Sequence, residues 1–397
     1  MTGKWFHAST KPFCRACENR SGLPNHIAQS LRCYAEISRS RIAENFRAAQ
    51  RAAGPHAEVM AVVKANAYGH GAVEVARVVC AEGAQWLAVS SVDEGITLRE
   101  AGITCRVLVM AGVMRWEHKA LQHFQLTPVA HSLDELRWFD ESGVTDIHLK
   151  VDTGLNRLGT HATAGAIAET LRNLRTVRLE GLLSHFASAS DFISPQTKDQ
   201  IRDFNEMAAA LASLGIKPRV MHFSSTNAVA YPRDDAAYSL VRPGHALYGY
   251  VSAARGQAPV CALLVKPALS WRTKIVVVKD LPAGAKVGYG GSFQAATPMR
   301  IAVLAAGYAD GVPHRLSNKG KVIAGGRLAS IIGTVSMDLT TIDITHVPHL
   351  QAGDEVTLLG TEGDVTLDAQ QIAHMAGTIS YNVLCGISAR VKRIYVD

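Results

Sequence analysis

The chain has 397 residues, of which 48% are apolar and 19% are charged. This composition excludes an intrinsically disordered chain, and the length predicts two domains or one barrel with an appended domain. The 41 basic residues exceed the 34 acidic ones and give a net charge of +7, but they form no long Lys/Arg block. A diffuse excess of this kind is weak support for nucleic-acid binding.

The sequence predicts a soluble cytoplasmic protein. No apolar run reaches membrane-spanning length, and residues 1–32, a loose extension, lack the apolar middle of a secretory signal. The 7 cysteines do not have the pattern of a secreted disulfide framework. Cys14 and Cys17 have metal-ligand spacing, but only His26 and Cys33 could supply further ligands nearby, so we expect no metal site.

The ordered sequence begins with a strand-like piece at 33–37 and an amphipathic helix through Ile42 and Phe46. The uninterrupted apolar run Val59–Val63 then predicts a strand that is buried on both faces. Lys64 stands at the carboxyl end of this strand, and a Gly-rich loop and a helical apolar pattern follow it. In such a βα unit, catalytic groups belong at the position of Lys64.

Strand-like and helix-like segments alternate from there to about residue 255. Further expected strands are Trp86–Ser90, Val107–Ala111, Thr127–Ala130, Asp146–Val151, Leu179–His185, Val220–Ser225 and Tyr238–Val241. Expected helices include Asp93–Ala101, Ser132–Glu141, Ala162–Leu174 and Gln196–Leu214. About eight βα repeats predict an α/β fold built on a (β/α)8 TIM-like barrel rather than an open sheet.

Beyond residue 255 the segments are short, rich in β-branched residues and separated by Gly, Pro and Asp turns. Leu367–Ala376 is the only helix that we expect in this part. We therefore expect a barrel domain at residues 33–260, where a cofactor would bind, and a mostly-β C-terminal domain at 261–397.

Two kinds of chemistry are predicted at the mouth of the barrel. In a dry pocket the pKa of Lys64 can fall until the amine is a nucleophile that forms a Schiff base with a carbonyl compound or with pyridoxal phosphate. Ser225, Thr226, Gly244 and His245 follow late barrel strands, where hydroxyls and Gly amides commonly hold a phosphate. Taken singly, a surface lysine and helix-capping hydroxyls would explain these residues as well.

Taken together, the motifs resemble those of one family. The stretch Val62-Val-Lys64-Ala-Asn-Ala-Tyr68-Gly-His-Gly71 resembles the pyridoxal-phosphate signature of alanine racemases. In the same order follow Lys-x-Asp-x-Gly-x-x-Arg at 150–157, Ser184-His185-Phe186, Val241-Arg242-Pro-Gly244, Val287-Gly-Tyr289-Gly290, Gly307-Tyr308-Ala-Asp310-Gly311, the segment 333–338 and Tyr381-Asn-Val-Leu-Cys385. The resemblance covers residues 33–397.

The resemblance implies a pyridoxal-phosphate-dependent racemase that interconverts L-alanine and D-alanine and supplies D-alanine for peptidoglycan. It implies two catalytic bases, Lys64 and, from the other subunit of a homodimer, Tyr289. Two bases on opposite faces of one α-carbon let a proton leave one side and return on the other, as racemisation requires.

Other residues match further positions of the family's site. Those of the phosphate shell are Tyr68, Ser225, Thr226, Gly244, His245 and Tyr381, although His245 replaces an aliphatic residue. Arg242 matches the arginine that faces the pyridine nitrogen, and His185 lies with it in a hydrogen-bond chain. Arg157, Met337 and Tyr308 match substrate-binding and entrance positions, and Lys150 matches a lysine that the family often carries as a carbamate.

Three alternatives stay open. A serine or broad-specificity racemase of the same fold is the nearest, because side-chain size preference depends on pocket shape. A pyridoxal-phosphate lyase or decarboxylase is disfavoured by Arg242, because decarboxylases of this fold type carry an acidic residue at the ring nitrogen. The third is a catalytically idle cofactor-binding protein. The sequence does not decide whether the role is biosynthetic or catabolic.

Overall fold

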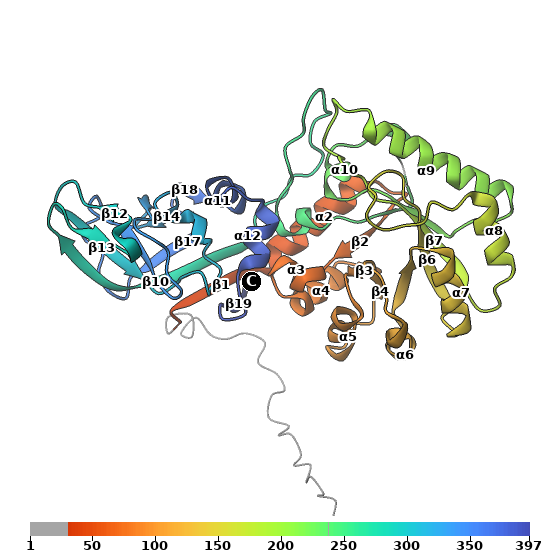
Figure 1. The fold of residues 1–397 in the computed structure, drawn as a ribbon, viewed down its shortest axis with the longest axis horizontal. Coiled ribbons are helices and arrows are strands. Elements are labelled where there is room, and N and C mark those ends of the chain that lie inside the picture. The colour runs from red at the N-terminus through yellow and green to blue at the C-terminus, as the bar shows by residue number, and fades with distance from the viewer. Residues whose placement is uncertain (1–30, 237) are drawn as a thin grey trace, which may run out of the picture.

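The computed structural model describes residues 31–236 and 238–397, which form two parts side by side (Figure 1). The first part is a barrel of parallel strands: β2 (Glu58–Val62), β3 (Trp86–Val89), β4 (Arg106–Val109), β5 (Thr127–Ala130), β6 (Asp146–Lys150), β7 (Arg178–Leu183), β8 (Val220–His222) and β9 (Leu240–Val241). They pair in the order β8-β7-β6-β5-β4-β3-β2-β9. The prediction of an eight-stranded barrel is confirmed.

The barrel closes between β8 and β9. Arg242 N donates a hydrogen bond to Ser224 O at 2.8 Å, and Ser225 and Arg242 form a parallel bridge. Because this seam lies at the carboxyl ends of both strands, closure brings two predicted site residues together.

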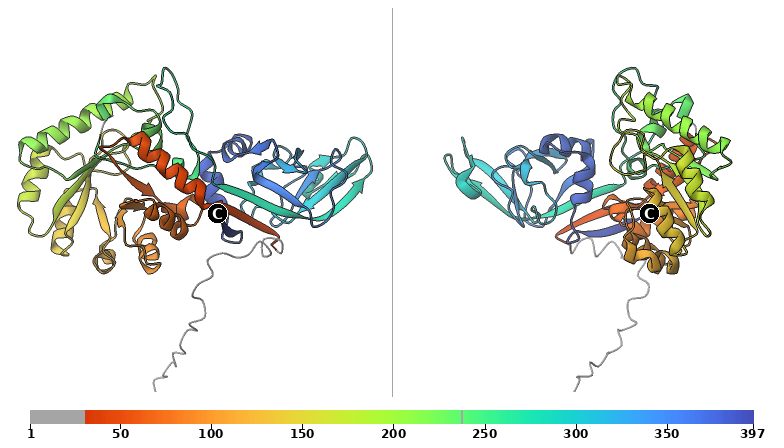
Figure 2. Two further views of the ribbon diagram at one scale, coloured as in Figure 1. Left: turned by 180° about the vertical axis from the view of Figure 1, so that it is seen from behind. Right: turned by 45° about the vertical axis from the view of Figure 1, so that its right-hand side comes forward.

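Helices surround the barrel strands (Figure 2). They are α2 (Arg39–Ala53), α4 (Ala72–Ala81), α5 (Val92–Glu100), α6 (His118–His123), α7 (Leu133–Glu141), α8 (Ala164–Arg172) and α9 (Gln196–Ser213). Their starts follow local sequence, since Ser91, Ser132 and Thr163 each cap a helix by accepting a first-turn N–H. Each buries apolar side chains, such as Phe46 in α2 and Phe139 in α7.

The second part is built on a nine-stranded sheet. Its strands are β1 (Cys33–Ser38), β10 (Leu269–Leu281), β13 (Met299–Leu304), β14 (Lys321–Ala324), β15 (Arg327–Ser330), β16 (Thr340–Asp343), β17 (Glu355–Glu362), β18 (Val365–Leu367) and β19 (Lys392–Val396). A separate ribbon joins β11 (Lys286–Val287) to β12 (Phe293–Gln294). The mostly-β character predicted for this part is confirmed.

The first strand of the described chain lies in this second sheet. β1 pairs antiparallel with β10 and parallel with β19, although it directly precedes the barrel helix α2. The domain limits at 33–260 and 261–397 stay a prediction, but the partners of β1 all belong to the C-terminal part.

The expectation of a single helix in the second part was wrong. Besides α11 (Ala369–Ala376), the chain forms α12 (Ser380–Gly386), which contacts α11 and α3 (Lys64–Tyr68). α12 is too short to show a helical period, and it has no side-chain N-cap. Packing against its neighbours therefore decides its structure.

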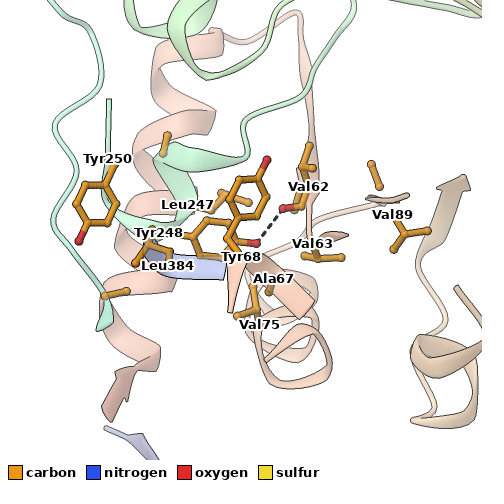
Figure 3. Close-up of a cluster of buried hydrophobic side chains, with 14 of the residues drawn as sticks. Val62, Val63, Ala67, Tyr68, Val75, Val89, Leu247, Tyr248, Tyr250 and Leu384 are labelled. Atoms are coloured by element: carbon orange, nitrogen blue, oxygen red, sulfur yellow. Dashed lines mark hydrogen bonds between the residues drawn. The ribbon is translucent and has the colours of Figure 1, made fainter. Parts of the chain in front are cut away.

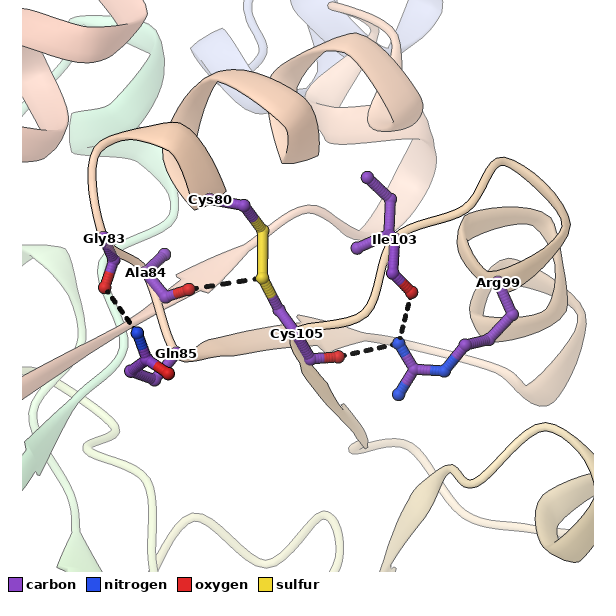
Figure 4. The surroundings of a disulfide bond; sticks show 7 residues. All are labelled: Cys80, Gly83, Ala84, Gln85, Arg99, Ile103 and Cys105. Atoms are coloured by element: carbon purple, nitrogen blue, oxygen red, sulfur yellow. Dashed lines mark hydrogen bonds between the residues drawn. A yellow bond between two sulfur atoms is a disulfide. The ribbon is translucent and has the colours of Figure 1, made fainter.

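Cys80, in α4, and Cys105, just before β4, are paired as a disulfide that the sequence did not predict (Figure 4). Within residues 31–236 and 238–397 no group of His, Cys, Asp and Glu is arranged to hold a metal ion. Cys14, Cys17 and His26 lie outside the described residues. No helix in the described stretches is both long and apolar enough to cross a bilayer.

Candidate active site

A cavity of about 740 Å³ lies at the carboxyl ends of the barrel strands. Its lining joins residues that are distant in sequence. One side is covered by Tyr381 and Cys385 of α12, in the second part, and by Ile379, which directly precedes this helix. The predicted site residues that line it are Lys64, Tyr68, Lys150, Arg157, His185, Ser225, Thr226, Arg242, Gly244, His245 and Tyr381.

The backbone after Lys64 is an unusual left-handed turn. Ala65, Asn66, Ala67 and Tyr68 have φ angles of 51°, 50°, 54° and 52°. For residues with a β-carbon this conformation costs roughly 1–2 kcal/mol per residue, so the surroundings must hold it in place. Asn66 Oδ1 accepts from Ala72 N at 2.8 Å and so ties the turn to the start of α4.

The Lys64 side chain is half-buried, and burial is the main cause that lowers the pKa of its amine. Arg157 lowers this pKa further, while Glu94 and Cys385 oppose the shift. A larger fraction of neutral amine, the nucleophilic form, follows from this balance.

A cluster of buried hydrophobic side chains that includes Tyr68 and Tyr248 lies next to this turn (Figure 3). Tyr248 is fully buried, and its hydroxyl donates to Val62 O at 2.8 Å at the end of β2. Its ring packs against Tyr68, with the ring centroids 4.8 Å apart. Tyr248, in the loop after β9, thus packs beneath the left-handed turn and supports it.

Thr226 and Gly244 form a polar cradle beside Tyr68. Thr226 Oγ1 accepts hydrogen bonds from Gly244 N at 3.1 Å and Ala246 N at 3.2 Å. A β-carbon at Gly244 would lie 2.6 Å from the Tyr68 hydroxyl, so only glycine leaves this space open. Because Thr226 Oγ1 accepts both bonds, its own O–H is free to donate, and the hydroxyls of Tyr68, Ser225 and Thr226 line the same cavity as Gly244. Donors of this kind are ones that a phosphate accepts from.

His245 lies between two tyrosines next to this cradle. Its ring is 3.9 Å from that of Tyr381 and 5.1 Å from that of Tyr250, stacked on both. Ser380 Oγ lies 3.3 Å from His245 Nε2, and burial lowers the pKa of the imidazole to about 4. The neutral ring thus joins the barrel to α12 and helps fix Tyr381.

Arg242 is buried at the base of the cavity. Its Nη2 donates to Ser184 O at 2.7 Å and Phe223 O at 3.1 Å and lies 3.3 Å from His185 Nδ1, while Nη1 donates to His222 Nδ1 at 2.7 Å. Burial lowers the pKa of the guanidinium to about 9, which still leaves it charged near neutrality. Burial and the Arg242 charge lower the pKa of His185 to about 3, so this imidazole is neutral.

A buried cation stands at the end of β6. Burial, followed by Arg157 and Arg242, lowers the pKa of Lys150 to about 8. Asp152 shapes the loop that carries Arg157, because its Oδ1 accepts from the backbone N–H groups of 154, 155 and 156 at 2.9–3.1 Å. A lysine that is partly neutral near pH 7 is open to reaction with carbon dioxide.

Three predicted site residues do not line this cavity. Tyr289, Tyr308 and Met337 lie in the second part and are 76%, 45% and 53% exposed. They stand on loops that bind one another: Tyr308 N donates to Ser336 O at 2.9 Å, and Thr334 Oγ1 donates to Tyr289 O at 3.3 Å. The chain thus presents these side chains together on an exposed surface away from its own cavity.

Sequence reasoning assigned no role to two residues that hold this site. His222 binds Arg242, and Glu94 accepts from Ala65 N at 2.6 Å. Their only sequence signals are the end of a barrel strand for His222 and the first turn of a helix for Glu94. Both positions are too common to single out a residue.

Lys64, the cradle at Gly244 and Arg242 define a class: barrel enzymes that bind a phosphate-bearing aldehyde cofactor through a lysine. The donor set fits pyridoxal phosphate, because an amine, a phosphate cradle that a β-carbon would fill and a buried guanidinium line one cavity.

Comparisons with known proteins agree with this class. The chain matches the family models for the N-terminal domain of alanine racemase at residues 37–252 and for its C-terminal domain at 268–395. It is 37% identical to the alanine racemase of Halothermothrix orenii over 91% of this chain and 96% of that protein.

Two solved structures are also similar. The alanine racemase of D-cycloserine-producing Streptomyces lavendulae has a TM-score of 0.85 and 32% identity over 92% of this chain and 97% of that one. The enzyme of Bartonella henselae, with covalently bound pyridoxal phosphate, has a TM-score of 0.82 and 26% identity over 92% of this chain and 100% of that one. The chain belongs to the alanine racemase family, whose members are pyridoxal-phosphate-dependent isomerases. The family, the enzyme class and the cofactor expected from the sequence are thereby confirmed.

Proposed function

We propose that this chain racemises alanine by a two-base mechanism in a homodimer, in the cytoplasm, and supplies D-alanine for peptidoglycan. The observation that carries the proposal is the gathering of Lys64, the Gly244 cradle and Arg242 around one cavity. Membership of the family supplies the reaction.

The cofactor, when bound, withdraws electrons from the α-carbon of the amino acid and so acidifies its proton. We assign Lys64 as the residue that holds the cofactor covalently and moves a proton at Nζ on one face of that carbon. The lowered pKa of this amine supports both roles. On the opposite face we assign the hydroxyl of the partner subunit's Tyr289 as the second base.

The cradle residues are assigned to the cofactor phosphate: Tyr68, Ser225, Thr226, Gly244, His245 and Tyr381. Arg242 is assigned to the pyridine nitrogen. Among the described residues its Nε–H has no partner, while Nη1 and Nη2 are occupied by His222, Ser184 and Phe223. A guanidinium donates a hydrogen bond there without giving up its proton, which limits electron withdrawal and disfavours competing reactions.

Substrate binding is assigned to Arg157, together with Met337 and Tyr308 of the other subunit. Arg157 is exposed, lines the cavity and makes no ion pair with another described residue, so its charge is available to a carboxylate. We assign Lys150 as a candidate carbamate, an anion that would orient Arg157 and offset the cluster of positive charge.

The division of the proposed site between two parts of the chain supports the homodimer. The cavity is on the barrel, whereas Tyr289, Tyr308 and Met337 are exposed on the second part. A second copy that places these loops at the cavity mouth would complete the site and cover these side chains.

The test is a racemisation assay by circular dichroism over a panel of L- and D-amino acids, with carbon dioxide and ammonia release measured in parallel. We expect inversion of alanine above all others in the wild type. Lys64→Ala should lose both the visible absorbance of lysine-bound cofactor and turnover. Preferred inversion of serine would favour the broad-specificity alternative, and release of carbon dioxide would overturn the proposal.

A further inference from the structure

Glu94 makes one contact that its place in α5 does not require. In the first turn of this helix, Glu94 Oε2 accepts from Ser90 N at 2.7 Å, and Ser91 Oγ accepts from Glu94 N at 3.4 Å. The Ser91 contact caps the helix, and the Ser90 contact binds the N–H of the residue before the cap. The other oxygen, Oε1, reaches the preceding βα unit and accepts from Ala65 N at 2.6 Å. One carboxylate thus connects α5 to the residue that follows Lys64.

Glu135 provides an internal comparison. In the first turn of α7, Glu135 Oε2 accepts from His131 N at 2.6 Å, and Ser132 Oγ accepts from Glu135 N at 3.1 Å. Both glutamates are half-buried. Among the described residues, however, Glu135 has no hydrogen bond to another βα unit. Contacts at the start of α5 therefore account for Oε2 of Glu94. The second oxygen, Oε1, has no hydrogen-bond partner in the βα unit to which Glu94 belongs.

The N–H that Oε1 binds is the first donor of the left-handed turn. Because Ala65 to Tyr68 all have positive φ, the turn is strained and needs contacts that hold it. Asn66 Oδ1 holds it to Ala72 N, and Glu94 holds it at Ala65 N. Loss of the Glu94 contact would free the residue next to Lys64.

The charge of Glu94 acts on Lys64 as well. It raises the pKa of the lysine and so opposes the larger effect of burial and the effect of Arg157. Glu94 does not line the cavity itself, so it would act through the lysine and not on bound molecules.

We propose that Glu94 is a positioning residue: its carboxylate holds the strained turn after Lys64 in place and thereby fixes the position of the Lys64 amine. The inference rests on the proposed function, because it concerns how the lysine assigned to the cofactor is aimed.

The first experiment compares Glu94→Gln with Glu135→Gln in the cofactor-loaded enzyme. A glutamine amide has one acceptor oxygen and one donor group, so against two N–H donors it keeps only one of the two contacts. We expect Glu94→Gln to lower kcat by about tenfold or more with KM nearly unchanged, since small misplacements of a catalytic group have effects of this size. The pH at which lysine-bound cofactor absorbance titrates should also shift. Glu135→Gln should change neither.

The second experiment needs no activity. Hydrogen exchange of the segment 64–71 is measured in wild type, Glu94→Ala and Glu135→Ala, with thermal unfolding as a check on folding. We expect exchange in this segment to rise about tenfold or more in Glu94→Ala only, because the Glu94 contact no longer limits local opening.

The outcomes separate the inference from the proposed function. Suppose that the wild type racemises alanine but the Glu94 variants behave like the Glu135 variants in both experiments. The positioning role of Glu94 is then rejected, and the proposed function is kept. Suppose instead that the wild type does not racemise alanine but Glu94→Ala alone raises hydrogen exchange of residues 64–71. The positioning role of Glu94 is then supported, and the proposed function is rejected.

Discussion

At the scale of single residues, the candidate phosphate site depends on the absence of one carbon atom. Gly244 has an ordinary φ of −116°, so its backbone does not require glycine. Its surroundings do, because a β-carbon would meet the Tyr68 hydroxyl at 2.6 Å. Tyr68 is held in turn by Tyr248 and by the left-handed turn, so it cannot easily move aside.

Gly244→Ala should therefore weaken cofactor binding more than it weakens folding. We expect the apparent affinity for pyridoxal phosphate to fall by about tenfold or more, since a filled cradle displaces the phosphate or Tyr68. Absorbance titration with the cofactor measures this. Gly165→Ala is the control, because its nearest neighbour would be Thr163 Oγ1 at 3.9 Å. Equal affinities in the two variants would contradict the assignment of the cradle.

Buried histidines make a second prediction at this scale. Burial lowers the pKa of His70 to about 4, of His185 to about 3 and of His245 to about 4. In the unfolded chain these histidines become protonated below about pH 6.5, whereas in the folded chain His70 stays neutral down to about pH 4. Because the unfolded chain binds more protons between these values, the free energy of unfolding falls as pH decreases through this window. Shifts of this size correspond to on the order of 3–5 kcal/mol each.

Urea unfolding at about pH 7.5 and about pH 5 tests this expectation. His70→Gln should reduce the pH dependence relative to the wild type. A free energy of unfolding that is constant across the window would show that the histidines are not held neutral by the fold.

At the scale of elements, the lysine-bearing turn is fitted against α12. A β-carbon on Gly69 would lie 2.4 Å from Leu384 O, a backbone atom of α12 that no rotamer change can move. Gly69 also has a φ of 83°. The contact sets the distance between the turn that carries Lys64 and the helix that carries Tyr381.

Gly69→Ala should thus cost more stability than a positive φ alone explains. Gly83→Ala is the matched control, because Gly83 has a φ of 93° and open space around it. We expect about 1–2 kcal/mol of destabilisation in the control and at least about 3 kcal/mol in Gly69→Ala, with loss of cofactor as well. Chemical denaturation and cofactor content measure the two effects. Similar losses of stability in both variants would mean that α12 can shift away from residue 69 at little cost.

At the scale of the whole molecule, the proposed dimer divides each site between two chains. Lys64→Ala and Tyr289→Phe should each be nearly inactive alone. In a mixed dimer, one site would join the intact Lys64 of one chain to the intact Tyr289 of the other. An equal mixture that exchanges subunits freely should therefore regain about a quarter of wild-type activity, because half of the dimers are mixed and one of their two sites is intact.

Activity is measured before and after the two variants are mixed under conditions that allow subunit exchange, with sedimentation to confirm the dimer. No recovery despite proven exchange would mean that Lys64 and Tyr289 do not meet across an interface. As a control, Lys64→Ala alone is taken through the same exchange procedure, and its activity is subtracted.

The barrel strands and most helix starts could be predicted from sequence, because their signals are local. Apolar runs such as Val59–Val63 and caps such as Ser91 act within a few residues. The partners of β1 and the existence of α12 could not be predicted in this way. Both depend on contacts with segments hundreds of residues away, as between Tyr34 in β1 and Arg272 in β10.

The candidate site divides along the same line. The residue types at Lys64, Arg242 and Gly244 were readable in the sequence because their chemistry requires those side chains in a fixed order along the chain. The left-handed turn, the reach of Glu94 Oε1 to Ala65 N and the stacking of His245 on Tyr381 were decided by tertiary structure alone. The free-energy cost of such strain is offset by packing interactions. These form between segments that meet only after the chain has folded, so the local sequence does not reveal them.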